Sequence, residues 1–135
     1  RLGKALITGE TSRRNCQLLH MTLNEVGFNT VELHAMISQR ERLASLAKFK
    51  SHVSKILIAT DVASRGLDIP AVSLVINHII PNNATDYVHR VGRTARAGRQ
   101  GLAVSIVTQH DIKIVQAIEN KINIRLKEYD VSGVY

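Results

Sequence analysis

Residues 55–60 read Lys-Ile-Leu-Ile-Ala-Thr, and residues 72–76 read Val-Ser-Leu-Val-Ile. Both runs are short, apolar and rich in β-branched side chains. The second run is nearly unbroken, which is typical of a strand covered on both faces in a parallel sheet. The segment between them ends at Ile69-Pro70, where the proline straightens the chain. The two runs therefore predict two buried strands of one sheet.

Strand and helix patterns alternate on both sides of this pair. Gly27 stands where the first helix should end, and Ser38 followed by Glu41 is the capping-box pattern of a second helix. Further strands are predicted at 5–8, 30–33, 103–107 and 124–128, and helices at 16–26, 38–50, 84–91 and 111–121. The apolar residues expected to face the core are Cys16, Leu19, Leu23 and Val26; Leu43, Leu46 and Ala47; and Ile112, Val115, Ile118 and Ile122. This alternation predicts an α/β domain with a mostly parallel central sheet flanked by helices.

The composition limits the class of protein. The chain has 135 residues, of which 44% are hydrophobic and 21% charged, so we expect a single globular domain over residues 1–135. Its net charge of +7 suggests a polyanionic partner. The single cysteine excludes an internal disulfide and favours a reducing, intracellular compartment, and no apolar run is long enough to span a membrane. Because the chain opens on Arg1, we expect it to be a fragment of a longer protein.

Residues 89–99 carry the densest chemical signal: His-Arg-Val-Gly-Arg-Thr-Ala-Arg-Ala-Gly-Arg. Arginine recurs every third residue, and no acidic side chain occurs from Tyr87 to His110. A guanidinium is permanently charged and planar, with a fork of donors that suits phosphate oxygens. The alternative is a solvated basic face, but the regular spacing and the two glycines favour a phosphate site.

A second segment, residues 59–70, leaves a buried strand and brings together hydroxyls, two carboxylates, an arginine and a glycine. Ligands of open parallel sheets gather beyond the carboxyl ends of the strands, where this segment is expected to lie. A carboxylate there can accept hydrogen bonds from ribose hydroxyls. By itself the segment favours the simpler interpretation, in which Asp61 and Asp68 only cap turns or a short helix.

Together, the two segments resemble motifs V and VI of the DEAD-box RNA helicases. Residues 39–42, Gln-Arg-Glu-Arg, stand five residues after His34 and are similar to the Gln-x-x-Arg element of that family. The resemblance covers nearly the whole chain and implies the C-terminal RecA-like domain, a three-layer fold. Residues 107–112 and 117–119 look like the subgroup that acts in ribosome biogenesis, which implies a location in the nucleus or nucleolus.

The resemblance implies a set of contacts to ATP. Arg93 and Arg96 match the arginine fingers that reach the γ-phosphate of ATP bound by the other RecA-like domain. Asp68 matches the carboxylate that contacts the ribose. His89 and Arg90 match residues that link the motif to the nucleotide site and to the facing domain. ATP and its Mg²⁺ would be held mainly by the N-terminal domain, and no metal site is expected within this chain.

The resemblance also implies contacts to one RNA strand. The matching residues are Gln39, Arg42, Thr60, Arg65 and Gly66, with Arg65 at the junction of the ATP and RNA sites. Contacts of this kind read phosphate and the 2′-hydroxyl rather than base edges, so weak sequence preference is expected. The implied partners are thus RNA, the N-terminal RecA-like domain and a regulatory protein, with no membrane.

Two elements that ATP hydrolysis requires do not occur in these 135 residues: a phosphate loop ending in Gly-Lys-Ser/Thr, and the Asp-Glu-Ala-Asp sequence. The chain is therefore expected to supply half of an ATP-dependent RNA helicase and to be inactive in isolation. Two alternatives stay open. One is a DNA-directed helicase or translocase of the same superfamily. The other is a stand-alone RNA-binding or protein-docking module that has kept the fold without the motor.

Overall fold

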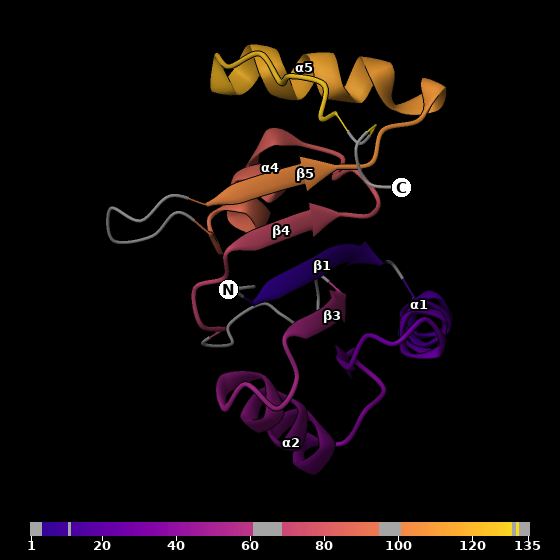
Figure 1. Cartoon of the computed structure of the whole chain (residues 1–135). Helices are drawn as coiled ribbons and strands as arrows, with labels where there is room; N and C mark the ends of the chain where they lie inside the picture. The colour runs from indigo at the N-terminus through magenta and orange to yellow at the C-terminus, as the bar shows by residue number, and fades with distance from the viewer. Residues whose placement is uncertain (1–3, 11, 61–68, 95–100, 131, 133–135) are drawn as a thin grey trace.

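The computed structural model describes residues 4–10, 12–60, 69–94, 101–130 and 132. Its centre is a five-stranded sheet with the strand order β2-β3-β1-β4-β5, in which every neighbouring pair is parallel (Figure 1). The strands are β1 (Ala5–Glu10), β2 (Thr30–Leu33), β3 (Ile56–Thr60), β4 (Leu74–Asn77) and β5 (Leu102–Ser105). The predicted α/β class with a parallel sheet is confirmed. All carboxyl ends of the strands consequently meet at one edge of the sheet.

The described helices are α1 (Arg13–Glu25), α2 (Gln39–Lys50), α4 (Ala84–Val91) and α5 (Ile112–Ile122), with a short 3₁₀ turn at Gln109–Asp111. In Figure 1, α4 lies behind β4 and β5, and α5 lies beyond β5 at the top of the view. None of the helices in the described part of the chain is long and apolar enough to cross a bilayer.

Alternation along the strands distributes the core over both faces of the sheet, because successive side chains point to opposite sides. Ile7 and Ile58 pack with Cys16 of α1 on one face. Their neighbours Leu6 and Leu57 belong to a larger cluster on the other face, which includes Leu46 and Phe49 of α2. The helices α1 and α2 therefore cover opposite faces of the sheet.

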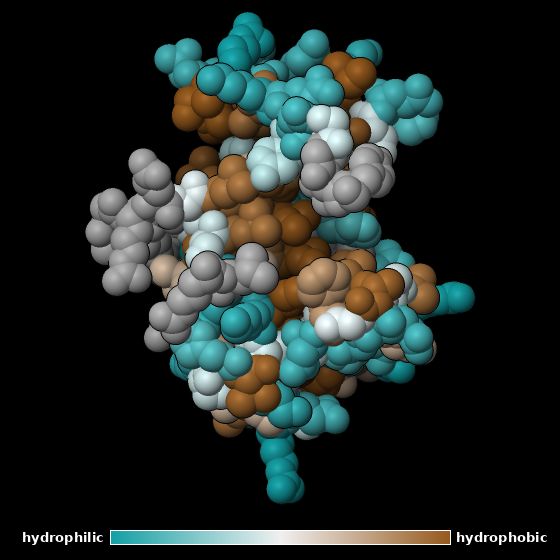
Figure 2. Space-filling model, in the orientation of Figure 1, coloured by the Kyte–Doolittle hydropathy of each residue, from teal (hydrophilic) through white to brown (hydrophobic). Residues whose placement is uncertain are grey.

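The prediction that residues 72–76 form a strand buried on both faces is only partly correct. Val75 is fully buried, but Leu74 and Ile76 are half-buried, and the strand itself spans Leu74–Asn77. The register pairs Leu74 with Leu102 of β5, which is 42% exposed. Figure 2 shows apolar side chains gathered in the middle of the face that the view presents. Among the described elements, α1 packs on β1, β2 and β3. The half of the sheet formed by β4 and β5 is therefore more open.

The inward faces of three helices also differ from the prediction. In α1, Val26 is the C-cap and is 66% exposed. In α2 the buried residues are Leu46 and Phe49, whereas Leu43 is 57% exposed and Ala47 is exposed as well. The large ring of Phe49 buries more apolar surface than Leu43 would, so the helix turns the stripe 42, 46, 49 toward the sheet. In α5, Ile118 is buried against α4, while Ile112 is 50% exposed because the helix begins there, next to the 3₁₀ turn.

The strand predicted at 124–128 does not form. Asn123 takes a left-handed conformation (φ +58°) at the end of α5, and the chain turns back along the helix. The backbone N–H of Ile124 donates to the Glu119 carbonyl at 3.2 Å, and that of Leu126 donates to Glu119 Oε2 at 2.8 Å. These donors are therefore used against α5 rather than against the edge of β5.

The capping box predicted at the start of α2 is present. The Glu41 N–H donates to Ser38 Oγ at 3.1 Å, and the Ser38 N–H donates to Glu41 Oε2 at 2.9 Å. Each bond pairs a backbone donor that the helix itself leaves without a partner. The sequence pattern thus located the first residue of this helix correctly.

We expect Ser38→Ala to lower the free energy of unfolding by about 1 kcal/mol, because the N-cap acceptor of α2 is lost. Urea denaturation measures the change. Ser51→Ala, at the exposed C-cap of the same helix, serves as the matched control and is expected to stay within about 0.5 kcal/mol of wild type. Equal losses in both variants would show that the Ser38 cap contributes nothing of its own.

Candidate functional site

The candidate site lies along the edge where the parallel strands end, as predicted for ligands of such a sheet. Thr60 is the last residue of β3 and is 6% exposed. It pairs with Glu10 of β1, after a register shift around Gly9. Of the predicted contacts, Gln39, Arg42, Thr60, His89, Arg90 and Arg93 lie within the described residues, and Arg65, Gly66, Asp68 and Arg96 lie outside them.

Gly9 permits a close approach between the end of β1 and the segment after β4. It has a φ of +104°, and a Cβ at this position would lie 2.5 Å from the Ile79 carbonyl oxygen and 3.2 Å from Arg90 Nη1. Any larger residue would push these groups apart. Sequence reasoning did not single out this role of Gly9, since the contact joins residues that are far apart in the chain.

Arg90 connects α4 to this edge. Its side chain is largely buried, and Nη1 donates to the Ile79 carbonyl at 2.6 Å. The helix begins at the N-cap Asn83, whose Oδ1 accepts from the Asp86 N–H at 2.9 Å. The buried ring of Tyr87 packs against Ile118 of α5, and its burial raises the pKa of Tyr87. These contacts set the position of α4 relative to the strand ends.

Arg93 lies just beyond Gly92, the C-cap of α4, and is half-buried. Its carbonyl accepts from the Val72 N–H at 2.9 Å, and the neighbouring Thr94 Oγ1 donates to the Val72 carbonyl at 2.5 Å. The Arg93 carbonyl and the Thr94 hydroxyl therefore tie this segment to the one that enters β4. A guanidinium carried on a fixed backbone loses less conformational entropy when it binds an anion.

His89 and Arg90 are neighbours in sequence but differ in their surroundings. His89 is exposed on the outer side of α4, where it lines a shallow groove with Val88 and Lys121, whereas Arg90 is buried. Arg90 is thus buried and Arg93 half-buried in the domain, whereas His89 is exposed to solvent.

Gln39 and Arg42 lie in the first turn of α2, whose amino end carries partial positive charge. Gln39 is exposed and Arg42 is half-buried. Arg42 stands on the inward stripe with Leu46 and Phe49, so the stem of its side chain lies along the sheet side of the helix. Its Nε is buried and has no hydrogen-bond partner among the described residues.

A further polar group follows β5. The backbone N–H and the hydroxyl of Thr108 both donate to Asp111 Oδ2 at 2.9 Å, which lowers the pKa of Asp111 below its usual value. Hydrogen bonds to the ionised form stabilise that form. Elsewhere in the described part of the chain, no three His, Cys, Asp or Glu side chains gather as metal ligands would.

We expect the stability difference between wild type and Asp111→Ala to depend on pH. A carboxyl whose pKa is lower in the folded state stabilises the fold above its unfolded pKa of about 3.9, and this contribution is lost as the pH falls through the folded pKa. Urea unfolding at pH 6 and at pH 3 should therefore show a gap that narrows in acid. A gap of constant size would contradict this, and Glu128→Ala, an exposed carboxyl, is the control.

Most of this chain matches a known protein family. The family model described as the helicase conserved C-terminal domain matches residues 1–98. The probable ATP-dependent RNA helicase DDX49 of Homo sapiens is 59% identical over 118 residues, which are 87% of this chain and 24% of that protein. The chain thus spans about a quarter of this curated relative.

Two solved structures share the fold. The E. coli DEAD-box protein SrmB, bound to the regulator of ribonuclease activity A, has a TM-score of 0.89 and 34% identity, covering 95% of this chain and 75% of that one. S. cerevisiae Dbp5, bound to RNA and ADP BeF3, has a TM-score of 0.79 and 32% identity, covering 88% of this chain and 32% of that one. These matches confirm the RecA-like fold, and with the family model they show that the chain belongs to the helicase conserved C-terminal domain family, among the DEAD-box proteins.

Proposed function

We propose that the chain is the C-terminal half of an ATP-dependent RNA helicase, which completes an ATP site on an N-terminal RecA-like domain and grips the RNA backbone. The observation that carries the proposal is the position of Arg93. Its backbone is tied to Val72, and it stands in a stretch of 24 residues, 87–110, that contains no acidic side chain. The charged side chains of that stretch are all basic, and a concentration of positive charge on a fixed backbone favours a phosphate.

On the nucleotide side, Arg93 and Arg96 act as arginine fingers toward the γ-phosphate, and Asp68 contacts the ribose. Arg90 holds α4 against the strand ends through Ile79, while the exposed His89 meets the facing domain. The guanidinium groups of Arg90 and Arg93 and the imidazole of His89 carry nitrogen donors that suit phosphate oxygens. These described residues therefore fit a role at a nucleotide. The N-terminal domain holds Mg²⁺ and most of the ATP.

On the RNA side, the contacts are Gln39, Arg42, Thr60, Arg65 and Gly66. Two described features support them: the amino end of α2 favours a phosphate, and Gln39 in its first turn is exposed. Both features act on the phosphate backbone of the RNA strand, so recognition depends little on the base sequence. The related Dbp5 was solved with both RNA and ADP BeF3 bound, which supports the division into two sites.

A regulatory protein and a nuclear role complete the proposal. SrmB was solved bound to the regulator of ribonuclease activity A, which supports a protein partner for this domain. Residues 107–112 and 117–119 support assignment to the ribosome-biogenesis subgroup and hence to the nucleus or nucleolus.

Strand separation tests the proposed function. The full-length protein should separate a short RNA duplex in the presence of ATP and Mg²⁺, and it should fail to do so without ATP. Calorimetry on the isolated chain should show no ATP binding at micromolar concentration, because only half of the site is present. Micromolar binding by the isolated chain, or no RNA-dependent ATP hydrolysis by the full-length protein, would contradict the proposal.

A further inference from the structure

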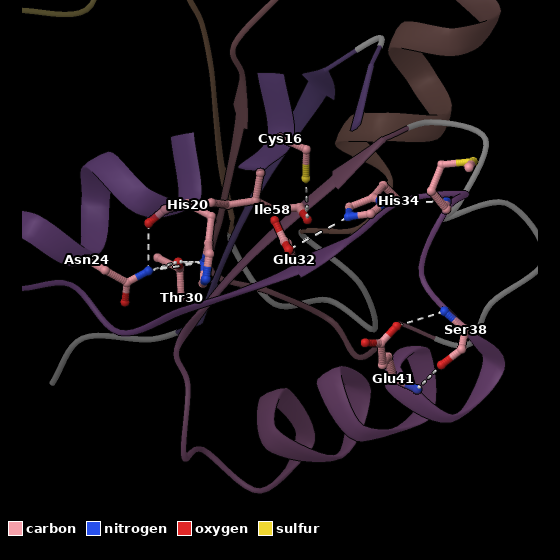
Figure 3. A network of polar contacts seen from close by, with 10 residues as sticks. Cys16, His20, Asn24, Thr30, Glu32, His34, Ser38, Glu41 and Ile58 are labelled. Carbon is pink, nitrogen blue, oxygen red and sulfur yellow. Dashed lines mark hydrogen bonds and ion pairs between the residues drawn. The ribbon is translucent and has the colours of Figure 1, made fainter. Parts of the chain in front are cut away.

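A buried histidine closes the turn that leads from β2 into α2 (Figure 3). His34 follows β2 directly, and the residue is 2% exposed. Its Nδ1 accepts a hydrogen bond from the Met36 N–H at 3.3 Å, and its carbonyl accepts from the Ile37 N–H at 3.4 Å. One residue thus satisfies two consecutive backbone donors of the turn.

The contact with Met36 also determines how the ring is oriented. Because an N–H group donates to Nδ1, the hydrogen of the neutral imidazole lies on Nε2. Nε2 faces the Glu32 carboxylate, with Oε1 at 3.7 Å, which is an electrostatic contact and too long for a hydrogen bond. The ring is therefore placed between the carboxylate of β2 and the backbone of the turn.

The turn continues without a break into the first turn of α2. Ser38 is the N-cap, bonded reciprocally to Glu41, and its carbonyl accepts from the Arg42 N–H at 2.9 Å. Any shift of residues 35–37 is transmitted to Ser38 and from there to the side chains of the first turn. Two of these side chains, Gln39 and Arg42, are the proposed RNA contacts on this helix.

We propose that His34 is a positioning residue for RNA binding: its Nδ1 holds the turn 34–38, so that the first turn of α2 presents Gln39 and Arg42 to the RNA backbone. His34 itself touches no RNA. This inference rests on the proposed function. A buried histidine that only stabilised the fold would not act on RNA affinity in particular. The positioning role assigns a change in RNA affinity to Nδ1 alone.

The other end of β2 supplies a matched control. His20 on α1 has its Nδ1 2.5 Å from Thr30 Oγ1 and 3.1 Å from Asn24 Nδ2, and Thr30 is the first residue of β2 (Figure 3). This histidine therefore also ties a polar ring to β2, at the end remote from the turn that enters α2. Replacement of His20 should lower the stability of the fold without changing RNA binding.

Two polar substitutions separate the nitrogens of His34. The Oδ1 of asparagine lies near the position of Nδ1, so His34→Asn keeps an acceptor for Met36, whereas the amide of His34→Gln lies near Nε2. In the full-length protein we expect His34→Gln to raise the Kd and the KM for single-stranded RNA about three- to tenfold. The kcat at saturating RNA and the KM for ATP should not change. His34→Asn and His20→Gln should bind RNA as the wild type does.

Hydrogen exchange gives a second readout that does not depend on RNA. Amides of residues 36–42 should exchange faster in His34→Gln than in His34→Asn, while those of α1 stay unchanged. Equal RNA affinity in all variants would overturn the inference, as would an equal loss in His34→Asn and His34→Gln, or a loss of kcat and thermal stability without a change in KM. If Arg42→Ala also leaves RNA affinity intact, the proposed RNA site itself fails. If only Arg42→Ala weakens binding, the positioning role alone is wrong.

Discussion

Arg93→Ala in the full-length helicase is expected to reduce RNA-stimulated ATP hydrolysis by about 10³–10⁵-fold, the range found for arginine fingers in phosphoryl transfer. A finger stabilises charge that develops on the transferring phosphoryl group, so its loss lowers kcat far more than it weakens ATP binding. Arg96→Ala should give a loss of the same kind. Steady-state phosphate release at saturating RNA measures both.

The backbone around Arg93 makes this test specific. The Val72 N–H donates to the Arg93 carbonyl, and the Val72 carbonyl accepts from Thr94 Oγ1. Truncation of the Arg93 side chain removes neither contact, so the fold should be retained. Arg14→Ala on the exposed side of α1 removes the same charge far along the chain and should hydrolyse ATP at the wild-type rate. Wild-type hydrolysis by Arg96→Ala or by Arg93→Ala would show that the residue is not a finger.

Arg42→Ala is expected to weaken RNA binding by about tenfold or more, because a charged hydrogen bond to phosphate is lost. The plot of log Kd against log salt should also become flatter by about 0.7, since one phosphate contact on a single strand is removed. The KM for ATP should stay at its wild-type value. Fluorescence anisotropy at several salt concentrations gives both quantities.

Lys48→Ala is the control for this experiment, as it removes one charge from the last turn of the same helix. It should change the RNA affinity and the salt dependence much less than Arg42→Ala. An equal loss of RNA and ATP affinity in Arg42→Ala would contradict the assignment of Arg42 to RNA alone.

The fold could be predicted from the sequence to the level of its elements because the signals are local. Alternating strand and helix patterns indicated the parallel sheet, and Ser38 with Glu41 located the start of α2. Which face of a helix turns inward depends on competition between side chains. In α2, the ring of Phe49 decided this against Leu43, a tertiary effect that periodicity alone does not contain.

For the candidate site too, the local chemistry was predictable from the sequence, whereas the tertiary contacts were not. Chemistry made the arginines of residues 89–99 recognisable, because guanidinium groups without neighbouring acids favour phosphates. The contacts that position them were not predictable, since Gly9 meets Ile79 and Val72 meets Arg93 across the fold. The strand expected at 124–128 does not form for a related reason. The carbonyl and the carboxylate of Glu119 accept hydrogen bonds from backbone donors that a strand would use.

We expect this domain to serve an RNA-directed, ATP-driven motor, and comparing RNA with DNA of one sequence tests this role most directly. ATP hydrolysis by the full-length protein is measured with each single strand at saturating concentration. We predict strong stimulation by RNA and little by DNA, because the strand is recognised through its backbone and 2′-hydroxyl groups. Equal stimulation by both strands, or stimulation by neither, would contradict the account.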